Sequence, residues 1–390
     1  MKIAFDAQLF LDKEKTGIGW YGINLLEILN KENNFEFQFN TFKNSFHNDE
    51  FKCFDKYLKQ QNFNYKICNN EKMKSSIYRI LSTFLPISYS TLFGSSADVT
   101  VFLNYVIPPR VSGKKITMIH DLTYKAYPKT QKLKSRIWLS LTMKRTCKYA
   151  DYIITASEFS KNEIMKYFKI PENKIKVLSC GVDTNLFHDN YSNEDVIAIK
   201  DKYNILGEYY LYTGTLEPRK NIERLIMAYQ NIKAKYKDVP KLVISGKKGW
   251  LYNSIFKLVK ELQLESSIIF TGYIEEKDVP ILMYGARIFI YPSLYEGFGM
   301  PPLEAMACRT AVIVSNVASL PEVVGDAGLL VNPLSTSEIE QSIVLLEQNE
   351  ELRKEYMDKG FERSKLFTWS NVNRNFTDVL SKLNILNGKD

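Results

Sequence analysis

The stretch "RIFIYPSLYEGFGMPPLEAMA", residues 287–307, contains an apolar run, a glycine loop and a proline-led segment in direct succession. The run "RIFIYPS" predicts a buried strand. The prolines that open "PPLEAMA" suit the first turn of a helix, where a missing N–H leaves no hydrogen bond unmade. Glycines in "YEGFG" permit positive φ angles and let a ligand approach the backbone. Strand, tight loop and helix in this order are typical of a parallel α/β sheet.

Two glutamates, Glu296 and Glu304, lie eight positions apart in this unit. The pattern places Glu296 in the loop and Glu304 about one turn into the helix. A helix start offers unpaired N–H groups and a positive dipole end, which suit phosphate. We therefore expect the two carboxylates to hold different parts of one phosphate-containing ligand. A glycosidase acid/base pair is disfavoured, because such pairs act across one bond from separate elements. The alternative is a solvated loop carboxylate and a surface ion pair.

Further short apolar runs predict strands on both sides of a polar stretch, residues 188–204, which we interpret as a linker. The runs are residues 2–7, 98–103, 115–120, 151–157 and 174–179 before it, and 209–214, 241–246, 267–272, 287–293 and 310–316 after it. Nearly continuous apolar runs indicate parallel strands buried on both faces. The sequence thus predicts two consecutive α/β units, with Ser157 as a helix cap in the first. Residues 43–95 are interpreted as helical and loop-like.

The bulk composition is that of an ordinary globular protein with basic character. The 390 residues exceed what one core usually serves, and 52 Lys and Arg against 44 Asp and Glu give a formal charge of +8. This excess suggests an anionic partner: a nucleotide, nucleic acid or an acidic membrane surface. Five scattered cysteines without a C-x-x-C spacing predict reduced thiols and no metal site. With no signal-like start and no long apolar run, we expect a cytoplasmic protein, soluble or peripheral at the inner face of the plasma membrane.

One segment, residues 124–150, carries eight basic residues and no acidic one. Trp138, Leu139, Leu141 and Met143 are interleaved with the basic side chains. A basic amphipathic helix of this kind suits an anionic membrane surface. The alternative, a solvated lysine-rich face, remains open at this point.

The segment "EGFGMPPLEAMA" resembles the E-x₇-E signature of retaining glycosyltransferases of family four. The resemblance extends through "FDAQLFLDKEKTGIGWYGINLL", "MIHDLTYKAYP", "ASEFSKNEI", "VLSCGVDTNLF" and "YTGTLEPRKNIERLIMAY" in matching order. It implies the α/β fold called GT-B, with two Rossmann-like domains facing each other across a cleft. The expected domains are an acceptor-side domain over residues 1–190 and a nucleotide-sugar domain over residues 205–369. A helix at about 370–390 is expected to pack back on the first domain.

The resemblance implies transfer of a hexose from a nucleotide sugar to a hydroxyl, with retention of anomeric configuration. Within the family, these motifs most resemble those of bacterial mannosyltransferase-like enzymes of surface polysaccharide synthesis. This resemblance favours GDP-mannose as the donor over a UDP- or dTDP-sugar. The implied acceptor is a glycan or a polyprenyl-diphosphate-linked saccharide. No two aspartates are separated by one residue, so an Asp-x-Asp metal motif is absent from the sequence. We therefore expect a metal-independent enzyme without a cofactor, whose side chains and helix ends meet the charge of the leaving diphosphate.

Residue roles follow from the same resemblance. It implies catalytic roles for His120, Glu296, Arg219 and Lys220, with Glu296 contacting the transferred sugar. His120 is, of three histidines, the one at the carboxyl end of a predicted strand. Many family members carry their arginine at the position of Thr215 instead. The donor-binding residues implied are Gly17, Gly19, Ser245, Gly246, Tyr273, Ile274, Gly297, Phe298, Gly299, Met300, Pro301, Leu303 and Glu304, the last on the ribose hydroxyls.

Other functional classes fit the sequence less well. A pyridoxal phosphorylase would be far longer, and a sugar-nucleotide epimerase would not normally combine the Arg219–Lys220 pair with E-x₇-E. A nucleic-acid-binding protein is suggested only by the net charge, because no RNA- or DNA-binding motif accompanies it. A non-catalytic nucleotide-sugar-binding relative is disfavoured, since every expected site residue is present.

Overall fold

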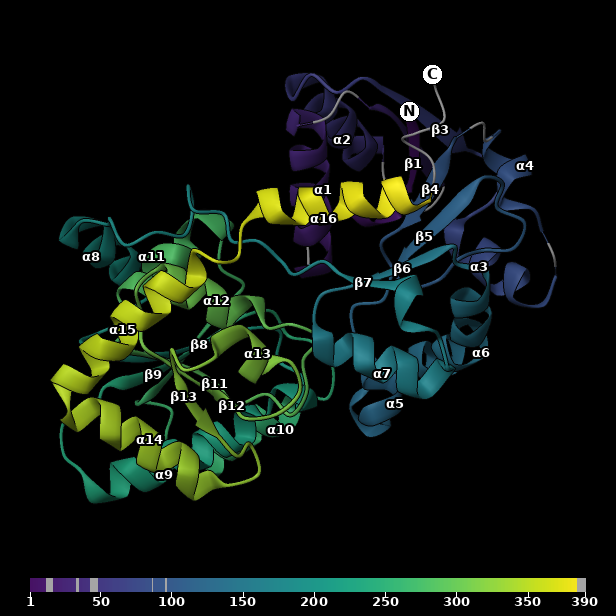
Figure 1. The fold of residues 1–390 in the computed structure, drawn as a ribbon. Helices are drawn as coiled ribbons and strands as arrows, with labels where there is room; N and C mark the ends of the chain where they lie inside the picture. The colour runs from purple at the N-terminus through teal and green to yellow at the C-terminus, as the bar shows by residue number, and fades with distance from the viewer. Residues whose placement is uncertain (12–16, 33–34, 43–47, 86, 95–96, 384–390) are drawn as a thin grey trace. The chain divides into compact units, whose positions relative to one another are not determined.

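The computed structural model describes the chain except for residues 12–16, 33–34, 43–47, 86, 95–96 and 384–390 (Figure 1). The chain divides into two compact units. Unit 1 comprises residues 1–124, 133–181 and 369–390, and unit 2 comprises residues 125–132 and 182–368. Each unit is built on its own parallel sheet, so the α/β class that the apolar runs predict is confirmed.

Seven parallel strands form the sheet of unit 1, in the order β3-β2-β1-β4-β5-β6-β7. They are β1 (Lys2–Asp6), β2 (Glu36–Phe42), β3 (Tyr65–Asn70), β4 (Val99–Phe102), β5 (Lys114–Met118), β6 (Tyr152–Thr155) and β7 (Ile175–Val177). The central strands are buried throughout, which explains their continuous apolar sequence. Five of these strands coincide with predicted runs, whereas β2 and β3 were not predicted.

The interpretation of residues 43–95 as helical and loop-like is wrong for β3. This strand pairs with β2 along one side and is half-exposed over most of its length. An edge strand needs no continuous apolar run, because one side faces solvent. The sequence "YKICNN" therefore carries little strand signal. The helices expected in this region do form.

Six parallel strands form the sheet of unit 2, in the order β10-β9-β8-β11-β12-β13. They are β8 (Tyr209–Thr213), β9 (Lys241–Ser245), β10 (Ile268–Gly272), β11 (Ile288–Tyr291), β12 (Val312–Ser315) and β13 (Leu329–Val331). All five runs predicted after the linker form strands, and β13 is an additional short edge strand. Both sheets reverse their strand order once, between β1 and β4 and between β8 and β11. Ligands of doubly wound sheets bind at the carboxyl ends of the strands at such switch points.

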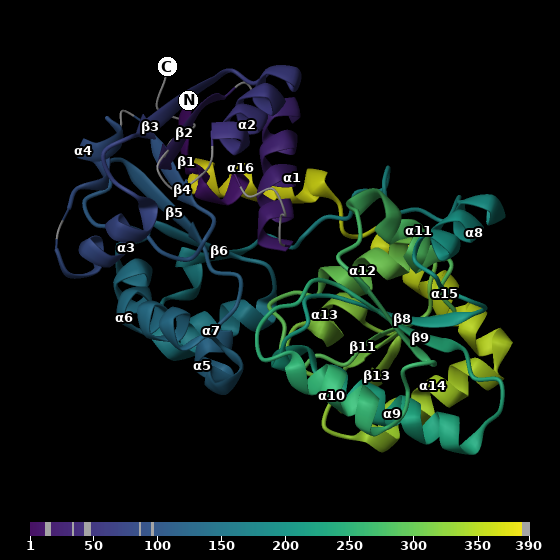
Figure 2. The ribbon, with the colours of Figure 1, turned by 180° about the vertical axis from the view of Figure 1, so that it is seen from behind.

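Helices cover the faces of both sheets (Figures 1 and 2). Those assigned to unit 1 are α1 (Gly17–Glu32), α2 (Asn48–Gln60), α3 (Ser75–Phe84), α4 (Tyr89–Phe93), α6 (Leu133–Tyr149), α7 (Glu158–Phe168) and α16 (Trp369–Lys382). Those of unit 2 are α8 (Asn193–Lys202), α9 (Ile222–Lys235), α10 (Asn253–Glu261), α11 (Val279–Tyr284), α12 (Met300–Ala307), α13 (Leu320–Val324), α14 (Thr336–Gln348) and α15 (Glu350–Ser364). A short helix, α5 (Thr123–Ala126), spans the passage from one unit to the other. As predicted, Ser157 caps α7 by accepting a hydrogen bond from the Ser160 amide.

The last helix, α16, belongs to unit 1 although it follows unit 2 in the chain. Figures 1 and 2 both show it, in yellow, beside α1. The rings of Tyr21 and Trp369 lie 5.5 Å apart at one end of this contact. Phe376, Val379 and Leu380 of α16 are buried. The chain therefore passes between the units four times, after residues 124, 132, 181 and 368.

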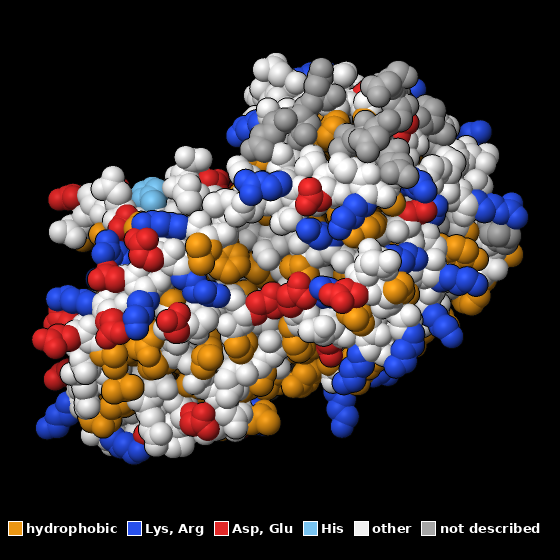
Figure 3. Space-filling view, in the orientation of Figure 1, with side chains coloured by type: hydrophobic (Ala, Val, Ile, Leu, Met, Phe, Trp, Pro, Cys, Tyr) orange, Lys and Arg blue, Asp and Glu red, His pale blue; other side chains and the backbone are white. Residues whose placement is uncertain are grey.

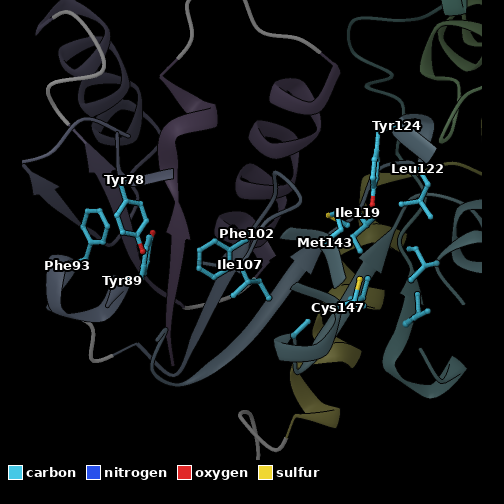
Figure 4. Close-up of a cluster of buried hydrophobic side chains, with 14 of the residues drawn as sticks. Tyr78, Tyr89, Phe93, Phe102, Ile107, Ile119, Leu122, Tyr124, Met143 and Cys147 are labelled. Carbon is cyan, nitrogen blue, oxygen red and sulfur yellow. The ribbon is translucent and has the colours of Figure 1, made fainter. Parts of the chain in front are cut away.

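One core of unit 1 combines aliphatic side chains with a group of aromatic ones (Figure 4). Tyr78, Tyr89 and Phe93 lie beside one another there, with the Tyr89 and Phe93 ring centroids 4.7 Å apart. Phe102 joins them from the end of β4. These rings fix α3 and α4 against the carboxyl edge of the sheet.

The polar stretch 188–204 differs from the expected linker. Residues 193–202 form α8, which packs on α11 within unit 2. The helix begins with a capping box in which Ser192 and Asp195 hydrogen-bond to each other's backbone. Such a box satisfies two end donors, which lets a helix start in a polar sequence.

The basic stretch 124–150 also differs from expectation, because it is not one helix. It contains α5, a 3₁₀ turn at Pro128–Thr130 and then α6. Pro128 ends helical geometry there, since proline lacks the N–H donor that a continuing helix needs. Trp250 Nε1 donates a hydrogen bond of 2.6 Å to the Thr130 carbonyl, which holds this turn within unit 2.

Candidate functional site

At the carboxyl edge of the second sheet, glycines at the ends of three strands allow the backbones of the following loops to lie close together. Gly214, Gly246 and Gly272 follow or end β8, β9 and β10, and all three have positive φ. The Gly214 amide donates to the Ser245 carbonyl, and the Gly246 amide donates to the Gly272 carbonyl. A Cβ on Gly246 would lie 2.0 Å from the Gly214 carbonyl oxygen. The loops at this edge thus depend on backbones that only glycine allows to come so close.

Glu296 lies in the loop between β11 and α12, buried and held by two cations. Arg219 Nη1 donates to Glu296 Oε2 at 2.7 Å, and Lys220 Nζ donates to Oε1 at 2.7 Å. Both cations follow β8, in the loop that includes the 3₁₀ turn Pro218–Lys220. The Leu294 amide also donates to the Arg219 carbonyl, so backbone and side chains join the two loops. The residues that the sequence predicted to act together are in contact.

The protonation state of Glu296 follows from these contacts. Burial by itself would raise the pKa of Glu296, but Arg219 and Lys220 outweigh it and lower the pKa to about 2. Burial also lowers the pKa of Lys220, although Glu296 opposes this. Glu296 is therefore an ionised carboxylate that can only accept hydrogen bonds. With about four lone-pair sites on its two oxygens, it can accept further donors beside the two cations.

Three further residues support this network, and the sequence analysis did not single them out. Glu217 is buried and accepts hydrogen bonds from Arg219 Nε at 3.0 Å and Nη2 at 2.6 Å. The Tyr291 hydroxyl contacts Lys220 Nζ. Ser319 Oγ donates to the Glu296 and Phe298 carbonyls at 3.0 and 2.7 Å. Glu217 alone carried a sequence signal, since it lies inside the "LEPRKN" segment.

The start of α12 combines a positive-φ glycine with two prolines. Gly299 has φ +114°, and a Cβ there would lie 2.6 Å from Leu320 Cδ2. Pro301 and Pro302 have no N–H, so Gly299 and Met300 supply the amide donors of this helix end. The predicted helix start at the prolines is confirmed. An anion at the start of α12 would therefore find fewer backbone N–H donors than at the start of a helix without prolines.

Glu304, one turn into α12, contrasts with Glu296. Within the described part of the chain, no hydrogen bond or ion pair reaches its carboxylate. Burial raises the pKa of Glu304 to about 7, and the nearby Glu276 carboxylate adds to this effect. An unpaired acceptor in a sheltered position is unfavourable unless a ligand supplies the donors. Glu304 thus has the character of a ligand-binding group rather than of a surface ion pair.

The other predicted residues of unit 2 lie at the same sheet edge with differing burial. Ser245 and Ile274 are buried, whereas Tyr273 is 48% exposed. Phe298 is buried against Phe367, with ring centroids 5.8 Å apart. Leu303 is fully buried and packs into the unit. Contact with a ligand through Leu303 would therefore involve its backbone.

The remaining predicted residues belong to unit 1. His120 follows β5, and its Nε2 lies 2.7 Å from the Leu103 carbonyl oxygen. Because a carbonyl only accepts, Nε2 carries the proton and Nδ1 is left as an acceptor in the neutral ring. Burial lowers the pKa of His120. Gly17 is the first residue of α1 and has open space around it. Gly19 lies two residues further along the same helix.

Among the described residues, no cluster of three or more His, Cys, Asp or Glu side chains has the arrangement of a metal site. Nor does any helix in the described ranges have the length and apolarity to cross a membrane.

The two parallel sheets with their covering helices define the class of fold, which is GT-B. The fold is that of Anabaena HepE, solved in complex with UDP and glucose. That structure matches with a TM-score of 0.75 at 18% identity, covering 98% of this chain and all of the other.

Sequence comparison gives the family. The family model "Glycosyl transferases group 1" matches residues 195–363, and "Glycosyltransferase Family 4" matches residues 101–186. The O-antigen chain mannosyltransferase B of Escherichia coli is 35% identical over 271 residues, covering 69% of this chain and 70% of the relative. The O-antigen chain mannosyltransferase RfbU of Salmonella typhimurium is 28% identical over 279 residues, covering 71% and 72%. The chain therefore belongs to glycosyltransferase family four.

Proposed function

We propose that this glycosyltransferase transfers mannose from GDP-mannose to a glycan or lipid-linked saccharide during synthesis of a bacterial surface polysaccharide, with retention and without a metal. The site of unit 2 is the observation that carries the proposal. It pairs a cation-held carboxylate, Glu296, with an unpartnered one, Glu304, at the switch point of the sheet. The names of the two bacterial relatives support mannose and the O-antigen. A UDP- or dTDP-sugar is the alternative donor.

The proposed roles follow from charge. Lys220 and Arg219 offset the negative charge that develops on the departing diphosphate, and the Gly299 and Met300 amides add donors at the helix end. Glu304 accepts the two ribose hydroxyls. Glu296, ionised and already held by two cations, accepts hydroxyls of the transferred sugar, which fixes the ring without attacking it. His120 is assigned to the same sugar through its free Nδ1 acceptor.

The proposed chemical step is a same-face transfer. The bond between the anomeric carbon and the diphosphate oxygen breaks, and a bond from that carbon to the acceptor oxygen forms. The acceptor hydroxyl proton passes to the leaving phosphate oxygen, so no enzyme base is required. Analysis of the product's anomeric configuration by NMR tests this proposal, and an inverted linkage would exclude it.

Donor binding is tested by thermal unfolding with GDP, UDP, ADP and dTDP, each with magnesium and with EDTA. A ligand that binds only the folded state at 100 times its Kd stabilises it by about 2.7 kcal/mol. We expect GDP to raise Tm equally in both conditions, and Glu304→Ala to abolish the increase. Glu265→Ala, at an exposed loop position, is the matched control. Stabilisation by another nucleotide would replace GDP-mannose, and no stabilisation by any would refute the proposed donor site.

The proposed membrane association is supported by an exposed face of unit 1. On α3, Ile77, Ile80 and Phe84 share one face, and on α6, Leu133, Ile137 and Leu141 do so. All six are exposed, Phe84 to 75%. Figure 3 shows lysine and arginine side chains among hydrophobic ones over the area where Figure 1 places α3 and α6. Apolar side chains interspersed with cations suit the headgroup boundary of an anionic bilayer.

Liposome flotation tests this association. We expect the protein to float with vesicles containing 30% phosphatidylglycerol, and the double variant Phe84→Ser/Leu141→Ser to remain in the lower fraction. Leu251→Ser/Leu334→Ser, two exposed leucines of unit 2, serves as the control. If neither protein floats, or if both float equally, this face is not the docking surface.

A further inference from the structure

Trp369 is the first residue of α16 and the first residue after the chain returns from unit 2 to unit 1. Its indole ring packs on the Tyr21 ring, with centroids 5.5 Å apart, where α16 and α1 lie side by side (Figures 1 and 2). The indole Nε1 is buried and has no hydrogen-bond partner in the part of the chain that the structure describes. Ring packing rather than hydrogen bonding therefore holds this side chain.

Tyr21 connects Trp369 to His120. The Tyr21 ring lies 6.1 Å from the imidazole at an interplanar angle of 85°, an edge-to-face geometry that aromatic rings favour. Tyr21 is only 1% exposed, and its hydroxyl lies 3.5 Å from the Leu178 carbonyl oxygen. A hydrogen bond of that length is weak, so it does little to fix the ring. The position of the Tyr21 ring thus depends on its packing, in which Trp369 takes part.

His120 itself is oriented by one hydrogen bond and two aromatic rings. Its Nε2 donates to a backbone carbonyl at 2.7 Å, which fixes the tautomer but leaves the ring free to tilt about that bond. Tyr105 provides the second ring, at a centroid distance of 5.5 Å. Tyr105 has φ +62°, which is strained for a bulky residue, and Thr117 Oγ1 holds it there by donating to its carbonyl at 2.6 Å. Tyr105 is thus fixed by its own loop, whereas the position of Tyr21 depends on Trp369.

The residues just before Trp369 contact the candidate site of unit 2. The Phe367 ring lies 5.8 Å from the ring of Phe298, in the loop between β11 and α12 that carries Glu296. The Phe367 carbonyl also accepts a backbone hydrogen bond of 3.0 Å within unit 2, which anchors this residue. Only Thr368 therefore separates the ring that packs on the loop of Glu296 from Trp369.

We propose that Trp369 is a positioning residue for His120. Through Tyr21 it holds the imidazole in the orientation in which Nδ1 accepts from a hydroxyl of the transferred sugar. Through Phe367 its own position follows the loop that carries Glu296. Misplacing a reacting group by about 1 Å costs about 10²-fold in rate, so a tilt of the imidazole is enough to affect turnover. The inference rests on the proposed transferase function and on the sugar-binding role of His120.

Removal of the indole tests this assignment, with turnover measured as GDP released from GDP-mannose below the lowest Tm of the set. Trp369→Ala should lower kcat about tenfold or more, whereas GDP affinity and donor KM should stay within about twofold, because the nucleotide-binding residues are unchanged. Trp369→Phe keeps a ring against Tyr21, so we expect its kcat to stay within about threefold of the wild type. A merely structural tryptophan would change Tm and leave the kcat of the folded enzyme unaltered.

Two further variants separate action through His120 from a general effect on unit 1. A residue that acts through His120 has nothing to position in His120→Ala, so His120→Ala/Trp369→Ala should be as slow as His120→Ala alone. Phe376→Ala is the matched control, because Phe376 is a buried ring about two turns further along α16. It should lower Tm and leave kcat unaltered. Multiplied losses in the double variant, or a kcat in Phe376→Ala as low as in Trp369→Ala, overturn the assignment.

The orientation of His120 is also measured directly, without substrate. In protein labelled with nitrogen-15 at its three histidines, the ring signals of His120 are those absent from His120→Ala. We expect widely separated signals of a protonated Nε2 and a bare Nδ1 in the wild type, Trp369→Phe and Phe376→Ala. In Trp369→Ala these signals should broaden or shift toward each other, and unchanged signals overturn the proposal. Failure of the proposed function would appear separately, as absence of GDP binding and GDP-mannose hydrolysis while the nitrogen signals still respond to Trp369→Ala.

Discussion

Burial acts on two glutamates of the same loop and helix, Glu296 and Glu304, with opposite outcomes. Glu296 has two cations within hydrogen-bonding distance and a pKa of about 2. Glu304 has no cationic partner in the described structure, and burial together with the nearby negative charge of Glu276 raises its pKa to about 7. Desolvation raises a carboxyl pKa unless nearby opposite charges outweigh it. The first glutamate is thus a permanent acceptor, whereas the second becomes one near neutral pH or when a ligand supplies donors.

The raised pKa of Glu304 predicts a pH dependence of nucleotide binding. Between about pH 4.5 and 7 the free folded protein keeps a proton that the unfolded chain has released, so this group's contribution to stability falls as pH rises through that window. Ribose hydroxyls donate to the ionised form, so we expect GDP affinity to increase from pH 5.5 to 8. Calorimetric titration at both pH values measures it. Because the diphosphate titrates as well, Glu304→Gln is measured in parallel, and an identical pH profile in that variant would contradict the assignment.

Replacing Glu296 by Gln should affect both turnover and stability. The variant leaves Arg219 and Lys220 buried without their common carboxylate, which for a buried pair costs about 3–5 kcal/mol. Loss of one preorganised polar contact in the transition state lowers kcat about 10²–10³-fold. Turnover is measured below the reduced Tm, so that folded enzyme is compared with folded enzyme.

Glu340→Gln is the control for this variant. Glu340 is a buried carboxylate of α14 that pairs with Lys235 and Asn231, far along the chain from the predicted site. Its kcat should stay near that of the wild type. Near-normal turnover in Glu296→Gln would remove Glu296 from the sugar-binding role.

At the scale of elements, the second site is assembled by glycine-containing strand ends. β8, β9 and β10 end side by side, and their following glycines allow carbonyl and amide groups to pair across the loops. The β11–α12 loop is held from the other side by Ser319 and by the Arg219 carbonyl. Glu296, Arg219 and Lys220 therefore project from short loops that follow rigid strands, whereas Glu304 projects from α12.

Gly246→Ala should destabilise the protein strongly. Its φ of +141° suits glycine, with strain of about 1–3 kcal/mol for other residues, and the added Cβ would clash with the Gly214 backbone. We expect a loss of about 3 kcal/mol or more in the free energy of unfolding, measured by denaturant titration. Gly17→Ala, in open space at a helix start, should change it by less than about 1 kcal/mol. Equal effects of the two variants would show that the strand-end contact is not tight.

At the scale of the whole molecule, the chain's end stabilises its beginning. The α16 helix belongs to unit 1 and buries Phe376 and Val379 beside α1, although unit 2 precedes it directly in the sequence. Removing a few C-terminal turns would thus affect the unit that starts at residue 1. Sequence adjacency alone would assign the effect to the wrong unit.

Phe376→Ala is expected to lower the stability of unit 1 by about 3–5 kcal/mol, as for a fully buried phenylalanine. Hydrogen exchange should accelerate for amides of α1 and β1 and stay unchanged for β8 and β11. Leu366→Ala, at an exposed leucine of unit 2, should leave both sets unchanged. Faster exchange in unit 2 instead would contradict the assignment of α16.

The sequence by itself determined the strands buried on both faces, because such strands need continuous apolar runs, and it determined the helix start at Pro301, because proline suits only that turn. It also indicated that Glu296, Arg219 and Lys220 act together. Only the tertiary structure revealed β3, α8 and the break at Pro128. The edge strand β3 is half-exposed, α8 starts in a polar sequence through its capping box, and the break at Pro128 depends on one missing N–H donor. None of the three leaves a strong periodic pattern in the sequence. The partners Glu217 and Ser319 and the opposite pKa shifts of the two glutamates were likewise decided by packing. These properties depend on contacts between side chains from distant parts of the chain, and such contacts cannot be read from the local sequence.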